Sequence, residues 1–317
     1  MRKWIYASLF VVLPVTAFAA EGIMDWAYPM PPQGLPPADN VVKKQAKGAK
    51  TGMMLTQQEI NNQFGPPDWF PDEHPQMPAV VSNGRRPNVL ACMLCHLPTG
   101  GGHPESASVA GLTAKYTIDQ MHAFRDGNRK NVRTVAMERI AKDITEDELK
   151  QAAEYFASIK GPQLKWYRTV ESATAPKNHV GAGGMRFRDE GNGTVPIAAN
   201  MIYELPEDEE GAENRDQHAG FVAYVPMGSI KKGETIAMTG VNGKTIQCAI
   251  CHGEGLKGLG DVPRLAGRSP YYVIRQLKDM QSGARKGTSI ALMQPVVKNL
   301  TDEDIINLAA YVVSRAP

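Results

Sequence analysis

The sequence predicts a mainly α-helical protein made of two tandem copies of one small domain, joined by a long and partly β-rich segment. Three observations lead to this prediction. Residues repeat at an offset of 156 positions, each copy ends in a capped amphipathic helix, and short β-prone runs lie between the copies. At 317 residues, the chain is long enough for two domains of ordinary size plus connecting material.

The N-terminal segment has the pattern of a secretory signal peptide. Arg2 and Lys3 precede an apolar stretch, 4–18, which ends in small residues. An uncleaved membrane anchor is the alternative, but a span needs about 20 apolar residues, and this stretch is shorter and contains Pro14. We therefore expect cleavage of residues 1–20, export to the periplasm, and a soluble mature protein with no transmembrane span.

The composition excludes several classes of protein. With 42% hydrophobic and 21% charged residues, the chain is typical of a soluble globular protein. Loss of the signal segment removes two of the 35 basic residues and none of the 33 acidic ones, so the mature chain has no formal net charge. A nucleic-acid partner would need a concentrated basic face, and none is therefore expected.

Two parts of the chain lie outside the repeat. Residues 21–56 are rich in proline, glycine and lysine, which predicts an extended arm that either wraps the first domain or reaches a partner. Residues 161–227 form a connecting segment for which we predict a small β-rich subdomain. Its β-prone runs are 166–170, 201–203 and 221–224, and an acidic stretch, 207–210, is typical of a solvated loop.

The four cysteines fall into two identical motifs. Cys92 and Cys95 are followed by His96, and Cys248 and Cys251 by His252. This C-x-x-C-H spacing is the attachment signature of c-type haem, because two thiols add across the two vinyl groups and the adjacent histidine lies beneath the iron. A thioredoxin-like redox site or half a zinc site would require neither the histidine nor a second copy. The sequence therefore predicts two covalently bound haem c groups.

The motifs lie in a repeated domain. Met137 matches Met293, each 45 residues after the first cysteine of its motif. The final helices begin with equivalent capping boxes, at Thr145 and Thr301, and continue with apolar residues at helical spacing. The other matched pairs include Gly111/Gly267, Tyr116/Tyr272, Gln120/Gln276, Gly127/Gly283, Arg129/Arg285 and Lys130/Lys286.

On these motifs the sequence resembles the class I cytochromes c, in particular the tandem dihaem cytochromes of the bacterial periplasm. The resemblance covers about residues 80–160 and 228–316, which places cytochrome c domains at 57–160 and 228–317. It implies small helical domains in which a methionine on a downstream loop supplies the sixth iron ligand. Met137 and Met293 match that ligand, with His96 and His252 as the proximal ligands.

Other residues near the motifs have either a functional or an ordinary structural role. Arg129 and Arg285 either contact haem propionates, or contribute to a docking face, or form a solvated basic turn. Tyr116 and Tyr272 either contact the haem or its propionates, or are core tyrosines. Apolar packing is expected of Met121 and Met280, and surface or loop positions of His74, His103, His122, His179 and His218.

The two copies also differ. Gly233 would let an N-terminal helix approach the closing helix near Tyr311, whereas the first copy has Met77 within a proline-rich stretch, so its first helix is expected to be displaced, shortened or missing. Pro263 resembles the family proline whose carbonyl orients the proximal histidine. The first copy has Ala107 there, so we expect that contact to be supplied differently.

A His/Met-ligated iron has no open position, which favours electron transfer over catalysis. The prediction is therefore an electron carrier, not an enzyme, that acts between redox-partner proteins. The donor would be a dehydrogenase or a quinol-oxidising protein, and the acceptor an oxidase or reductase. One alternative is an electron-transfer subunit of a dehydrogenase or oxidase complex. A dihaem enzyme such as a peroxidase is the other, and it would need an iron that can open.

Overall fold

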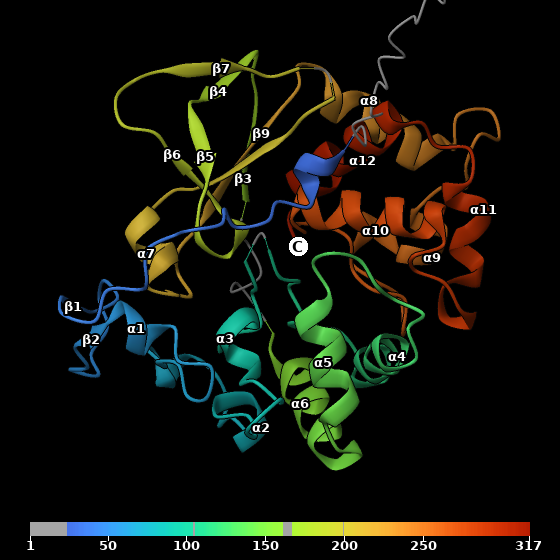
Figure 1. The fold of residues 1–317 in the computed structure, drawn as a ribbon. Coiled ribbons are helices and arrows are strands. Elements are labelled where there is room, and N and C mark those ends of the chain that lie inside the picture. Colours follow the sequence, from blue (N-terminus) through green and yellow to red (C-terminus); the bar gives the residue numbers. More distant parts are fainter. Residues whose placement is uncertain (1–23, 104, 161–166, 199) are drawn as a thin grey trace, which may run out of the picture.

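A computed structural model describes residues 24–103, 105–160, 167–198 and 200–317. The expected signal peptide, 1–20, lies outside the described residues. The protein is mainly helical, as predicted. Figure 1 shows one helical unit in green, a second in orange and red, and a group of strands in yellow-green beside them.

The first helical unit packs its helices around a core from 80 to 159. Its elements are α2 (Ala79–Ser82), α3 (Cys92–His96), α4 (Ala114–Arg125), α5 (Val135–Asp143) and α6 (Glu146–Ser158). The predicted capping box at Thr145 is present, since its side chain accepts from the Glu148 amide and the Glu148 side chain accepts from the Thr145 amide. The apolar face that follows is buried, with Leu149 at 2% and Phe156 at 4% exposure.

The elements of the second helical unit follow a similar order, with a longer helix at the start. They are α8 (Ser229–Thr239), α9 (Ala249–His252), α10 (Pro270–Ser282), a 3₁₀ helix (Thr288–Met293), α11 (Gln294–Val297) and α12 (Asp302–Ser314). Thr301 caps α12 in a second capping box. At Gly233, a Cβ atom would lie 1.9 Å from the Asn307 carbonyl oxygen, so glycine is required for the close crossing of α8 and α12. The predicted role of Gly233 is confirmed.

The first unit has no comparable long helix at its start. The helix directly before α3 is α2, which has four residues and follows the proline-rich stretch around Met77. The other described helical turns between 57 and 91 are equally short, at Gln57–Ile60 and Pro71–Glu73. The expectation of a shortened first helix is thus confirmed. Proline removes a backbone donor and disfavours the α conformation in the residue before it, which limits any helix in this stretch.

The connecting segment contains three separate small sheets. In the largest, β9 (Phe221–Val225) lies between β3 (Tyr167–Glu171) and β8 (Tyr203–Pro206). Strands β3 and β9 fall on the predicted runs 166–170 and 221–224, whereas β8 shares only Tyr203 with the predicted run 201–203. Strand β9 is parallel to β3 and antiparallel to β8. The other pairs are β4 (Thr174–Pro176) with β7 (Thr194–Pro196), and β5 (Asn178–Val180) with β6 (Arg186–Arg188). Part of the acidic stretch forms α7 (Glu209–Glu213), capped by Asp208.

The N-terminal arm packs on the second helical unit, which neither of the two expectations for it had named. Its first turn, a 3₁₀ helix at Asp25–Ala27, lies against α10, and Ala27 is fully buried in the core shared with α12. Tyr28 donates a hydrogen bond to Asp279 over 2.8 Å. The arm then runs toward α7 (Figure 1) and on to β1 (Lys43–Lys44), β2 (Leu55–Thr56) and α1 (Gln57–Ile60).

In the part of the chain that the structure describes, no helix combines the length and the apolar character needed to cross a membrane.

Candidate haem sites

Each C-x-x-C-H motif forms a short helix. The four cysteines lie on or next to α3 and α9, and all of them are free. Burial raises the pKa of Cys92 to about 12 and that of Cys248 to about 11, so both thiols are protonated in this environment. The motifs thus present two pairs of unbridged thiols, as covalent attachment of two haems requires.

The histidine of each motif is oriented by a backbone carbonyl. His252 Nδ1 lies 2.7 Å from the carbonyl oxygen of Pro263, as the resemblance predicts. His96 Nδ1 lies 2.8 Å from the carbonyl oxygen of Ala107. The expectation that the first unit supplies this contact differently is therefore wrong, since a main-chain carbonyl is available whichever side chain the residue carries. In both units Nε2 is left for a metal.

The two imidazoles are also in the protonation state that an iron ligand needs. Burial lowers the pKa of His96, and it lowers the pKa of His252 in the same way. The neutral form, with one nitrogen available as a donor to metal, is thereby favoured. The residues of both motifs fit a covalently attached haem.

The candidate methionine ligands lie at equivalent places but in different local structures. Met137 is in the first turn of α5 and packs against the core cluster that also contacts Cys92 and Cys95. Met293 ends the 3₁₀ helix before α11 and packs with the cluster of Met280, Ile290 and Val297. Both side chains are partly buried. Met121 and Met280 are buried, at 7% and 5% exposure, in agreement with the packing role expected of them.

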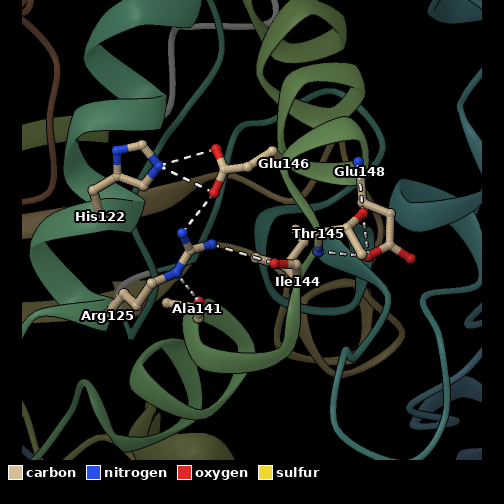
Figure 2. Close-up of polar contacts among 7 residues, drawn as sticks. All are labelled: His122, Arg125, Ala141, Ile144, Thr145, Glu146 and Glu148. Atoms are coloured by element: carbon tan, nitrogen blue, oxygen red, sulfur yellow. Dashed lines mark hydrogen bonds and ion pairs between the residues drawn. The ribbon is translucent and has the colours of Figure 1, made fainter.

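A polar anchor holds each methionine-bearing segment to the preceding long helix. Arg125, on α4, donates to the carbonyl oxygens of Ala141 and Ile144 over 2.7 and 3.2 Å, and also pairs with Glu146 (Figure 2). His122 reaches the same Glu146 carboxylate, 3.1 Å away, and the Thr145–Glu148 capping box lies beside it (Figure 2).

The second unit repeats this anchor with a different side chain. Gln281 Nε2 donates to the carbonyl oxygens of Val297 and Leu300 over 2.7 and 2.8 Å. These three residues lie 156 positions after Arg125, Ala141 and Ile144. The anchor was missed in the sequence because arginine and glutamine do not match, although both can donate to the same two carbonyls.

The repeated arginines meet between the two units. Arg129 and Arg285 form an isolated antiparallel β-bridge, and both are buried, at 7% and 5% exposure. Each guanidinium donates to the side-chain oxygens of both Gln120 and Gln276, at 2.7–3.0 Å. A solvated basic turn is therefore excluded for these two residues.

The repeated tyrosines complete this cluster across the two units. Arg129 donates to the Tyr272 hydroxyl and Arg285 to the Tyr116 hydroxyl, each over 3.2 Å. Burial by itself raises the pKa of Tyr272, but Arg129 and its neighbouring arginines outweigh it and lower that pKa below the usual value. The electrostatic environment here is strongly positive.

Two further buried arginines were not identified from the sequence. Arg264 and Arg268 are 8% and 3% exposed, and both reach across to Ser108 of the first unit. Burial, reinforced by Arg268, lowers the pKa of Arg264 to about 9. Within the described residues neither is in an ion pair, and Arg268 Nη2 and Arg285 Nε are buried without a hydrogen-bond partner. Buried cations of this kind are costly unless an anion is supplied, and haem propionates have the required charge.

The other five histidines belong neither to the two motifs nor to the cluster of arginines and tyrosines. His122, His179 and His218 have exposed side chains, as expected. His103 does not, because it is 3% exposed and hydrogen-bonded to Glu105 at 3.0 Å. The side chain of His74 is also largely covered, at 3% exposure.

Comparisons with known proteins agree with the motifs. The family described as cytochrome c oxidase, cbb3-type, subunit III matches residues 236–312. Cytochrome c-554(548) of Halomonas halodenitrificans is 42% identical over 69 residues, which are 22% of this chain and 83% of that protein. A thiosulfate dehydrogenase electron acceptor of Thiomonas intermedia is 25% identical over 232 residues, 72% of this chain and 80% of that protein. Cytochrome c4 of Azotobacter vinelandii is 32% identical over 82 residues, 24% of this chain and 39% of that protein.

Proposed function

Because the chain belongs to the class I cytochrome c family and binds covalently attached haem c, we propose that it carries electrons between redox-partner proteins in the periplasm. The observation that carries the proposal is the presence of two C-x-x-C-H motifs, each with a histidine that a backbone carbonyl orients. When bound, each haem supplies an iron that alternates between Fe(III) and Fe(II).

In this proposal a histidine and a methionine of the chain would ligate each haem iron. His96 and His252 are the proximal ligands, held in one orientation through Nδ1. Met137 and Met293 are the sixth ligands, and the anchors at Arg125 and Gln281 hold the segments that carry them. A thioether ligand favours the reduced iron and leaves no site for a substrate.

The buried arginines have a separate role. Arg129 and Arg285, with Tyr116 and Tyr272, would bind haem propionates between the two units. This accounts for two buried cations that form no ion pair with a carboxylate side chain among the described residues. Propionates held from both sides would place the two haems near each other, so that electrons can pass within one molecule. The two cytochrome c domains would be residues 57–160 and 228–317, and residues 1–20 would be removed on export to the periplasm.

A second candidate is the electron-accepting subunit of a dehydrogenase complex. The relative from Thiomonas intermedia is named as the electron acceptor of a thiosulfate dehydrogenase, and its similarity extends over 232 residues, which are 72% of this chain. A donor of that class is therefore our first candidate partner. Copurification of a stable partner with the exported chain would favour this subunit role over a free carrier.

The test is a visible spectrum of the purified mature protein, oxidised and reduced, with and without carbon monoxide. We expect two haems per chain, the methionine–iron charge-transfer band in the oxidised form, and no response to carbon monoxide. A carbon monoxide shift would show that one iron is open, and it would contradict a simple carrier. The mass of the same sample shows whether residues 1–20 are removed.

A further inference from the structure

Equivalent positions of the two repeats differ greatly in exposure around the haem-attachment helix. Leu94, within the first motif, is 6% exposed, whereas its counterpart Ile250 is 63% exposed. His103, beyond the first motif, is 3% exposed, and its counterpart Leu259 is 60% exposed. Because both units belong to the same chain, the difference in exposure comes from the other segments of the chain that pack on each unit.

The connecting segment covers this face of the first unit. The ring of Phe221, on β9, lies edge-on to His103 with centroids 6.1 Å apart. Arg215, just after α7, donates to the carbonyl oxygen of Leu94. Leu97, directly after α3, is fully buried with apolar residues of the connecting segment: Met185, Phe187, Ala212, Ala219 and Phe221. The cover is therefore mostly apolar and aromatic, with one arginine.

Within the described residues, the connecting segment does not cover the same face of the second unit in this way. Helix α9 lies apart from the strands of the connecting segment (Figure 1). The turn that carries Leu259 is tied to the end of α9, because the Gly258 amide donates to the His252 carbonyl oxygen over 2.8 Å. The exposed charged side chains near Ile250 and Leu259 in the chain are Glu254, Lys257 and Asp261, two acidic and one basic. Two large apolar side chains thus lie exposed beside the second haem motif, with few charges near them in the chain.

We propose that the face around Ile250 and Leu259 is the docking site for a redox-partner protein that presents an uncharged apolar patch. The first unit indicates this kind of partner, because the connecting segment covers its equivalent face with a mostly apolar and aromatic surface. The connecting segment thereby leaves the second unit as the place where partners exchange electrons. Apolar side chains with few charges are typical of the centre of such interfaces. This inference rests on the proposed electron-carrier function.

The test compares two electron acceptors for the fully reduced holoprotein. One is a purified blue-copper protein whose metal lies beneath an uncharged apolar surface. The other is ferricyanide, a small anion that needs no apolar docking surface. Each transfer to the copper protein oxidises one iron from Fe(II) to Fe(III) and reduces one copper from Cu(II) to Cu(I). Stopped-flow absorbance gives both second-order rate constants.

We expect the ratio of the copper-protein rate to the ferricyanide rate to fall at least tenfold in Leu259→Glu and in Ile250→Glu. Val41→Glu is the matched control, because Val41 is 78% exposed and lies on the N-terminal arm, and its ratio should equal that of the natural protein. Two test variants are used so that, if haem attachment fails in one of them, the other still tests the proposal.

Three outcomes would overturn the inference or its premise. An unchanged ratio in both variants would show that this face does not dock the partner, while leaving the carrier function intact. A natural protein that dimerises in sedimentation experiments, with Leu259→Glu monomeric, would mean that a second copy occupies the face. Failure of the natural protein to reduce ferricyanide at all would count against the proposed function itself.

Discussion

Arg129 and Arg285 lie side by side between the two helical units, although they are 156 positions apart in the chain. Their backbones form a β-bridge, and their guanidinium groups share the oxygens of Gln120 and Gln276. Two cations so close together repel each other, and burial together with Arg285 lowers the pKa of Arg129. Such a pair is stable only where anionic groups compensate it, which is the basis of the first prediction.

Arg129→Gln is expected to lower the reduction potential of at least one haem. Loss of a buried positive charge favours the oxidised iron, and burial leaves that charge poorly screened. A potentiometric titration of the holoprotein measures the effect. The matched control is Lys130→Gln, because Lys130 follows in the same turn but is exposed to solvent. Equal shifts in the two variants would argue against a propionate-binding role for Arg129.

Met137→Ala and Met293→Ala should each open one iron. We expect the oxidised protein to lose part of the methionine–iron charge-transfer band, and the reduced protein to bind one carbon monoxide per chain. Met121→Leu and Met280→Leu are the controls, since both residues are buried packing methionines on the preceding helices. If a variant at 137 or 293 remained unresponsive to carbon monoxide, the sixth ligand of that haem would have to be another residue.

Gly233→Ala should destabilise the second unit. The added Cβ would overlap the Asn307 carbonyl oxygen and lie 2.8 Å from the Tyr311 Cβ, so α8 and α12 must move apart. Overpacking of this kind costs about 1–3 kcal/mol of unfolding free energy. Denaturant unfolding followed by circular dichroism gives the value. Gly193→Ala is the control, because its Cβ would meet only ordinary contacts at 3.6 Å. Equal stabilities would refute the close crossing.

Glu204 should make stability depend on pH. It is 1% exposed and accepts from the Ser269 hydroxyl and the Tyr271 amide, each over 2.7 Å, and burial raises its pKa to about 7. A raised folded-state pKa means that this group contributes stability at low pH. The contribution is lost as pH rises from the ordinary value of 4.5 through 7.

Glu204→Gln should therefore gain about 3 kcal/mol of unfolding free energy relative to the natural protein between pH 4.5 and pH 8, because the amide keeps the acceptor and cannot ionise. Denaturant unfolding at a series of pH values measures this difference. A constant difference across the range would show that Glu204 titrates at the same pH in the folded and unfolded chains. Glu207→Gln is the control, since Glu207 is an exposed residue of the same segment.

The sequence by itself determined those features that depend on neighbouring residues or on the repeat. The C-x-x-C-H spacing identified both attachment helices, and the capping boxes located the starts of α6 and α12. Strands β3 and β9 were visible as β-prone runs, whereas β8 shares only Tyr203 with its predicted run. These signals lie within a few residues of one another, where local sterics and hydrogen bonding decide the conformation. The role of Gly233, whose crossing partners Asn307 and Tyr311 are distant in the chain, was implied by the resemblance to the class I cytochromes c.

The tertiary structure decided the contacts between distant parts. Tyr28 donates a hydrogen bond to Asp279, 251 positions later in the chain, so the N-terminal arm packs on the second unit. The residues near Tyr28 and Asp279 in the sequence did not predict this contact. In the first unit the carbonyl oxygen of Ala107 contacts the histidine, as that of Pro263 does in the second. The sequence did not predict this contact, because every residue has a main-chain carbonyl and the side chain does not show which one is used. The exposure of Leu259 against the burial of His103 depends on where the connecting segment packs. Such contacts depend on the relative placement of whole elements, which the burial of their combined apolar surface determines.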